Sequence, residues 1–161
     1  IKGNISEIAY LAEGIGTTKG VDANLDALST EGNLRWHTDL ARKVSTQTGA
    51  AIVISGPIDI VADSHEAWAI RNGHPMMANI TGTGCMSAGG IGCCVGADPQ
   101  ALLPSCVCAM SAMGICGELA YEKLLSVDGG SGTYRVLLMD AMSKLDGATL
   151  TRRSKAERLR I

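Results

Sequence analysis

The stretch TGTGC at residues 81–85, followed by the small-residue run MSAGGIG at 86–92, shows most clearly how the chain folds. The pattern predicts a short extended piece over residues 77–81 and a helix from Gly82 to about Gly96. Glycines at such a junction let the backbone approach a ligand closely. The free N–H groups of a helix's first turn attract anions. The sequence therefore predicts an anion-binding turn, and a tight turn with a packed core cysteine is the alternative left open.

The segments around this turn alternate between strand and helix patterns. Apolar runs predict strands at residues 1–2, 50–54, 58–62 and 67–70. Spaced apolar positions predict helices at residues 4–12, 34–47, 99–125 and 133–145. A glycine-rich loop is expected at residues 14–24, and the basic tail at 151–160 is interpreted as a solvated surface. This alternation predicts an α/β fold in a single domain over residues 1–161.

Composition limits the classes of partner. Hydrophobic residues make up 46% of the 161 residues, which is enough for a buried core. Lys and Arg total 14 against 16 Asp and Glu, so the net charge is -2 and nucleic-acid binding is disfavoured. The chain has 20 glycines and no Phe. We therefore expect a core closed by small side chains, with two buried helices that pack closely through Gly and Ala.

All six cysteines lie between residues 85 and 116, and none forms a CxxC pair. Structural zinc sites need Cys or His at ligand spacing, which this tract lacks. One helical tract also offers poor geometry for disulfides. With no signal peptide recognisable, we expect reduced, buried thiols in a cytoplasmic protein.

The same tract raises the alternative of a membrane hairpin. Its two apolar pieces, residues 86–97 and 101–117, are separated by Asp98, Pro99 and Gln100. Each piece is shorter than the ~20 residues that a spanning helix needs. Short apolar runs of this kind are typical of core helices, so no membrane association is expected.

The spacing Asn4-x-x-Glu7 allows two interpretations that are compatible. Asn and Glu three residues apart form a capping box at a helix start. A carboxylate at that place is also a ligand for Mg²⁺ beside nucleotide phosphates. A cap also fixes the direction of the side chain, so both interpretations stay open.

Five motifs taken together resemble a known family. In order they are KGNISEI at 2–8, KGVD at 19–22, SGPID at 55–59, NGHPM at 72–76 and TGTGC at 81–85. This set resembles the C-terminal part of the hydroxyethylthiazole kinases, in the ribokinase-like superfamily. Gly-x-Gly-Cys at 82–85, where the superfamily usually has Gly-x-Gly-Asp, is the most diagnostic piece. The resemblance implies a three-layer ribokinase-like α/β fold from which the N-terminal part is absent.

The resemblance also implies an activity and its residues. The family transfers the γ-phosphoryl group of ATP to the hydroxyl of 4-methyl-5-(2-hydroxyethyl)thiazole in thiamine salvage, using Mg²⁺. By motif, Cys85 takes the place of the catalytic base, Gly82 contacts the substrate, and Glu7 is the residue associated with Mg²⁺. The positions that match ATP-binding residues are Lys2, Asn4, Ser55, Thr83 and Gly84.

This sequence departs from the family pattern in several ways. Lys2 stands where the family usually has Arg, which keeps the charge and loses the planar fork. Ser55 stands where a Thr is usual, and Pro57 replaces an expected acidic residue. Family members are longer at the N-terminus and typically trimeric. We therefore expect a homotrimer when the chain is full length and an incomplete site in this fragment.

Two other functions remain open from the sequence. Another ribokinase-like kinase, for hydroxymethylpyrimidine or a sugar, is expected to carry Asp at position 85, where this chain has Cys. A non-catalytic nucleotide-binding module would keep the turn at residues 81–85 without the chemistry.

Overall fold

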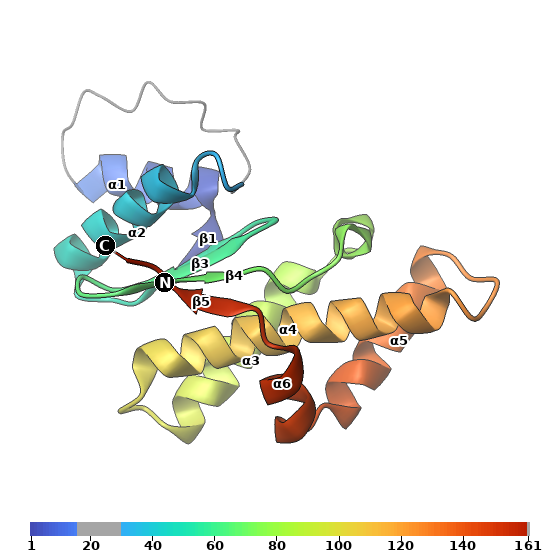
Figure 1. Cartoon of the computed structure of the whole chain (residues 1–161). Helices are drawn as coiled ribbons and strands as arrows, with labels where there is room; N and C mark the ends of the chain where they lie inside the picture. Colours follow the sequence, from blue (N-terminus) through green and yellow to red (C-terminus); the bar gives the residue numbers. More distant parts are fainter. Residues whose placement is uncertain (16–29, 161) are drawn as a thin grey trace. The chain divides into compact units, whose positions relative to one another are not determined.

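A computed structural model describes residues 1–15 and 30–160, which form two compact units. The first comprises Ile1–Ala69 and Glu157–Ile161, the second Ile70–Ala156. Figure 1 shows the helices and strands of the two units, with their labels. Most of the loop predicted at 14–24, and the KGVD motif at 19–22, lie outside the described residues.

The sheet is mixed, with its strands in the order β1-β2-β3-β4-β5. β1 runs parallel to β2, with Lys2 opposite Val53 and Asn4 opposite Ser55. β2 and β3 are antiparallel, with Ile54 opposite Ile60. The four predicted strands are confirmed, with bounds β1 Lys2–Asn4, β2 Ile52–Ser55, β3 Asp59–Ala62 and β4 Ala67–Ile70. A further strand, β5 Ala156–Arg158, was not predicted.

Two helices of the first unit, α1 (Ile5–Ile15) and α2 (Leu34–Thr48), pack against one face of the sheet. Ile8 and Val44 from these helices join Ile52, Ile54 and Ile60 from the strands in one buried cluster. Side chains alternate between the two faces of a strand. The residues between these isoleucines therefore point to the opposite face of the sheet.

The second unit is helical and built around α4 (Leu102–Leu124), which packs against α3, α5, α6 and the 3-10 helix η1. The α4–α5 contact is closed by Tyr134, which is fully buried and donates from its hydroxyl to the Gly117 carbonyl at 3.0 Å. The remaining elements are η1 Pro75–Asn79, α3 Thr83–Ala97, α5 Ser131–Lys144 and α6 Gly147–Arg153.

One expectation about local structure was wrong. Residues 75–79 form a 3-10 turn where an extended piece was predicted from residue 77. Pro75 occupies a first-turn position, and Nδ1 of His74 accepts from the Met76 N–H at 3.1 Å, so both residues start a turn. The basic tail at 151–160 is mostly exposed, as predicted, and it also contains the end of α6 and β5, where the Leu159 N–H donates to the Ala67 carbonyl at 2.8 Å.

The prediction of two buried small-residue helices is confirmed for α4 and wrong for α3. Within the described chain, Ser87 is the one buried residue of α3. The cysteines divide in the same way: all six are free, but Cys85, Cys93 and Cys108 are exposed and Cys94 is half-buried. Burial of all six thiols is therefore also wrong.

α4 is 23 residues long, so the argument that no apolar piece reaches spanning length does not hold for it. Among the described helices it is the one long and apolar enough to cross a membrane. Of its most apolar window, 61% is buried inside the structure. This matches a core helix, which passes the same length test.

Candidate functional site

The parallel pair β1–β2 brings three predicted nucleotide-binding residues to one edge. Asn4 and Ser55 end their strands opposite each other, and Lys2 lies two residues before Asn4. Paired residues on neighbouring strands share a face, and this face is opposite to the one that packs against α1 and α2. The Ser55 hydroxyl donates to the Gly3 carbonyl at 3.4 Å, which ties the two strand ends together.

The capping box at the start of α1 is confirmed. The Asn4 N–H donates to Oε2 of Glu7 at 2.7 Å, and the Glu7 N–H donates to Oδ1 of Asn4 at 2.9 Å. A Cβ at Gly3 would lie 3.0 Å from the same Oε2, so glycine leaves room for the carboxylate. The cap therefore holds an exposed carboxylate beside the ends of β1 and β2.

Glu7 fits Mg²⁺ only as a partial ligand. Across residues 1–15 and 30–160, no group of three or more His, Cys, Asp and Glu side chains could hold a metal ion. Mg²⁺ is commonly bound through one or two carboxylates together with substrate phosphates and water. A single exposed carboxylate is enough for that mode of binding.

Asp59 is a candidate site residue to which the sequence analysis gave no role. It begins β3, one step beyond the Ile54–Ile60 pair, and so lies opposite Ser55. Its side chain is buried, and Oδ1 accepts from the Gly56 N–H at 2.9 Å. Burial raises the pKa of Asp59 to about 7, and the Gly56 N–H and the Lys2 charge act in the opposite direction. The available signal was a carboxylate opening an otherwise apolar strand.

In the second unit, α3 begins at the predicted glycine. Gly82 caps it with a φ of 103°, a left-handed conformation that favours glycine, and its carbonyl accepts from the Met86 N–H at 2.9 Å. Gly84 and Cys85 are exposed, and Thr83 is half-buried. The predicted helix start is confirmed, and its turn faces solvent in this chain.

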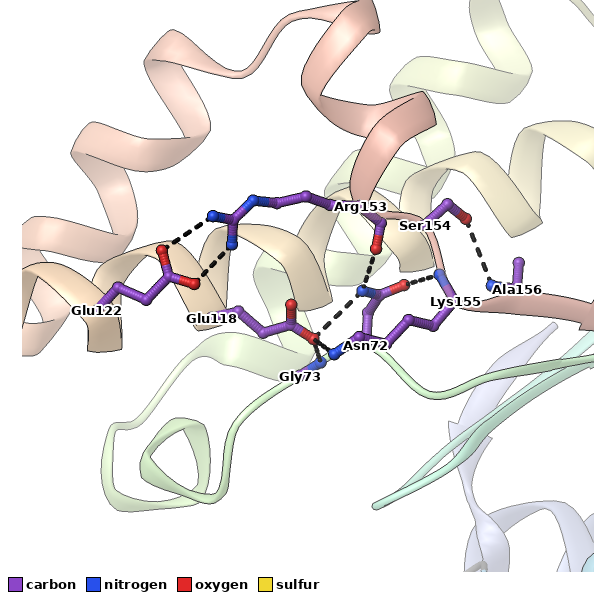
Figure 2. A network of polar contacts seen from close by, with 8 residues as sticks. All are labelled: Asn72, Gly73, Glu118, Glu122, Arg153, Ser154, Lys155 and Ala156. Carbon is purple, nitrogen blue, oxygen red and sulfur yellow. Dashed lines mark hydrogen bonds and ion pairs between the residues drawn. The ribbon is translucent and has the colours of Figure 1, made fainter.

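A polar network holds the segment that leads into this turn (Figure 2). Nδ2 of Asn72 donates to Oε1 of Glu118 at 3.2 Å and to the Arg153 carbonyl at 3.0 Å. The Lys155 N–H donates to Oδ1 of Asn72 at 2.7 Å. Glu118 also accepts from the Gly73 N–H at 3.0 Å and from Nζ of Lys155 at 2.9 Å. The network therefore fastens Asn72 and Gly73 to α4 and to the chain after α6.

Two glycines of α4 allow this segment to lie close to the helix. A Cβ at Gly114 would lie 2.6 Å from backbone atoms of Asn72, and one at Gly117 would collide with the Met77 side chain. Beyond them, the His74 ring stacks on Tyr121, with ring centroids 3.5 Å apart. Residues 72–77, which precede the turn at 81–85, thus lie close to α4 at two positions where glycine leaves room for them.

The structure gathers the predicted site residues into two groups, one in each unit. The first unit holds Lys2, Asn4, Glu7 and Ser55 at the end of β1 and β2, with Asp59 added. The second unit holds Gly82, Thr83, Gly84 and Cys85 at the start of α3.

Comparisons with known proteins show which family the chain resembles. A sequence profile described as "Hydroxyethylthiazole kinase family" matches residues 1–148. A hydroxyethylthiazole kinase of Desulfovibrio desulfuricans is 49% identical over all of this chain, and one of Clostridium acetobutylicum is 44% identical over 93% of it. The solved structure of a hydroxyethylthiazole kinase from Pyrococcus horikoshii superposes with a TM-score of 0.77, covering 99% of the chain at 21% identity, which supports the α/β fold.

The chain spans only part of these proteins. It covers 59% and 55% of the two bacterial relatives and 54% of the Pyrococcus chain. The match of the family profile to most of the chain, together with relatives well above 30% identity, is decisive. The chain belongs to the hydroxyethylthiazole kinase family.

Proposed function

We propose that this chain is the ATP-binding part of a kinase that phosphorylates the hydroxyl of 4-methyl-5-(2-hydroxyethyl)thiazole in thiamine salvage. The observation that carries the proposal is Gly82, whose φ of 103° opens α3 with Gly84 and Cys85 exposed to solvent. A helix N-terminus of this kind stabilises the negative charge of phosphate groups. Relatives of the chain are named for this kinase activity.

Binding of ATP is assigned to both groups of residues. Thr83 and Gly84 lie in the first turn of α3, where backbone N–H groups point toward an anion. Lys2 supplies a positive charge for the phosphates, and Asn4 and Ser55 supply polar atoms at the same strand ends. Glu7 is the residue that would hold Mg²⁺, whose chemistry is to neutralise phosphate charge.

The phosphoryl transfer needs little covalent chemistry from the protein. The thiazole hydroxyl oxygen attacks the γ-phosphorus as the bond to the bridging oxygen of ADP breaks, and Cys85 acts as the base that accepts the hydroxyl proton. The transition state is loose, so positioning and charge stabilisation dominate and a strong base is not essential. Gly82 contacts the acceptor, where the absence of a side chain permits close approach.

The chain spans 59% and 55% of the two bacterial relatives, and we propose that turnover requires a protein of the relatives' full length. In its complete form we expect the protein to be a cytoplasmic homotrimer that binds ATP and the thiazole alcohol. Residues 1–161 would form part of a single kinase domain in that assembly.

Titration calorimetry with Mg-ATP tests the proposal in this chain. We expect saturable binding that Gly82→Ala weakens, because alanine resists the left-handed conformation at this position. Joined to the additional residues of its relatives, the chain should phosphorylate the thiazole alcohol, and Cys85→Ala should lower kcat more than it changes the KM for ATP. Binding of ATP without phosphorylation by the completed protein would favour the nucleotide-binding module instead. No binding of ATP would contradict both functions.

A further inference from the structure

Asp59 is a buried carboxylate that neither the capping box nor the anion-binding turn uses. The residue is 9% exposed, and its carboxylate accepts a hydrogen bond from the Gly56 N–H at 2.9 Å. Along β3 it is flanked by the apolar Ile58 and Ile60, and on β2 it lies opposite Ser55. A charge in such surroundings destabilises the folded state unless a partner compensates it.

An asparagine would serve the fold better at this position. Its side-chain oxygen can accept the same Gly56 N–H, and it carries no charge to desolvate. Burial holds the pKa of Asp59 near 7, above its ordinary value of 3.8. The folded state therefore binds the proton of Asp59 more tightly than the unfolded state does. The contribution of Asp59 to the free energy of unfolding is present at low pH and is lost as the pH rises through about 4 to 7. Above pH 7 the ionised carboxylate lowers the stability of the chain.

The groups that face Asp59 belong to the candidate nucleotide site. Ser55 lies opposite it across the β2–β3 turn, and Asn4 lies beyond Ser55 on β1. Lys2 is on the same face of the sheet and contributes a Coulombic interaction with the carboxylate. Lys2 pairs with Val53 and so lies two residues along from the row of Ser55 and Asp59. β1 and β3 are two strand spacings apart, about 10 Å, a separation that a long lysine side chain can partly bridge. Among the described residues, Lys2 is the cationic group that acts on the Asp59 carboxylate, and it is a proposed ATP ligand.

We propose that Asp59 is a positioning residue of the nucleotide site, whose carboxylate orients the Lys2 ammonium group and, through the Gly56 N–H, fixes the Ser55 hydroxyl at the end of β2. This inference rests on the proposed function. The proposed role explains why a carboxylate stands at this position although its charge lowers the stability of the fold. The lysine side chain is flexible and lacks the planar fork of arginine. A fixed anion beside Lys2 restricts its side chain before ATP binds, so less conformational entropy is lost when the phosphates bind.

The test compares ATP affinity and folding stability in the same variants. Asp59→Asn should raise the Kd for Mg-ATP about tenfold, the typical loss of a charge-assisted contact. The same variant should unfold at a higher urea concentration than the wild type at pH 8, with the difference vanishing near pH 4. Asp63→Asn is the matched control, because Asp63 caps the next turn by accepting from the His65 and Glu66 N–H groups. It should leave the Kd unchanged.

A double-substitution cycle with Lys2→Met separates positioning from a general effect on the fold. If Asp59 acts through Lys2, Asp59→Asn should change the Kd much less in the Lys2→Met chain than in the wild type. An equal loss in both backgrounds would overturn the inference, as would wild-type affinity in Asp59→Asn.

If the proposed function is wrong, the ATP-binding and urea measurements give different results from those above. A wild-type chain that binds no ATP contradicts that function, and the assignment of Asp59 to a nucleotide site falls with it. The urea titrations then decide whether the carboxylate is structural. An Asp59→Asn chain less stable than the wild type at pH 8 would show that Asp59 serves the fold, and this result overturns the inference with or without ATP binding.

Discussion

α3 and α4 are built from similar residues and lie in opposite environments. Both helices are rich in Gly, Ala, Cys and Met. A Cβ at any of four α3 glycines would meet nothing within 4 Å, whereas one at Gly114 or Gly117 of α4 would collide with a neighbouring segment. The four α3 glycines are Gly89, Gly90, Gly92 and Gly96. A composition rich in small residues therefore shows that another segment can pack closely against a helix. Whether a segment does so depends on the helix's position in the fold.

The difference follows from the number of packing partners within the second unit. α4 contacts α3, α5, α6 and η1, and the Tyr134 hydroxyl reaches its backbone at Gly117. α3 has one substantial partner, α4. Glycine substitutions in the two helices should therefore change stability in opposite directions.

The largest expected effect is that of Gly114→Ala. The added methyl group would meet the Asn72 backbone at 2.6 Å, and backbone atoms held by the Glu118 network move only at high cost. We expect a loss of about 3 kcal/mol in the free energy of unfolding, measured by urea denaturation. A loss below about 1 kcal/mol would show that the segment is not fastened to α4.

Asn72→Ala tests the same contact from the other side. It removes three hydrogen bonds of a buried side chain and leaves the Lys155 N–H without its acceptor. The expected loss is about 2 kcal/mol. Asn79→Ala is the control, since Asn79 is exposed and its side chain makes a weak contact with Met76 Sδ at 3.4 Å. Equal losses in the two variants would contradict the role given to the network.

Gly117→Ala should cost less than Gly114→Ala, although both glycines are crowded. The atoms in the way belong to the flexible side chain of Met77, which can move, and alanine favours the helix. We expect a loss of about 1 kcal/mol in the same urea titration. A cost as large as that of Gly114→Ala would mean that Met77 is held as firmly as the backbone of Asn72.

Gly89→Ala in α3 has the smallest expected effect and the opposite sign. Gly89 is exposed and in open space, so alanine adds helix propensity without a clash. The chain should gain about 0.5–1 kcal/mol in the free energy of unfolding. Destabilisation by this variant would show that α3 is packed against a partner in solution.

Local patterns were enough to predict much of this structure from the sequence. The capping box at Asn4 and Glu7, the left-handed glycine at Gly82 and the apolar strands all depend on residues close together in the chain. The burial of Asp59 depends on strand pairing, and its interaction with Lys2 joins residues far apart in the chain, so the local pattern of a carboxylate opening an apolar strand did not reveal its role. The exposure of α3 also depends on contacts between helices that are far apart in the sequence.

The central claim is that the first turn of α3 receives the phosphates of ATP. The most direct test is an NMR titration that follows the backbone amide signals of residues 82–85 as Mg-ATP is added, with adenosine as the control. We predict saturable shifts of these amides with ATP and none with adenosine. Saturable ATP binding that leaves residues 82–85 unperturbed would contradict the account.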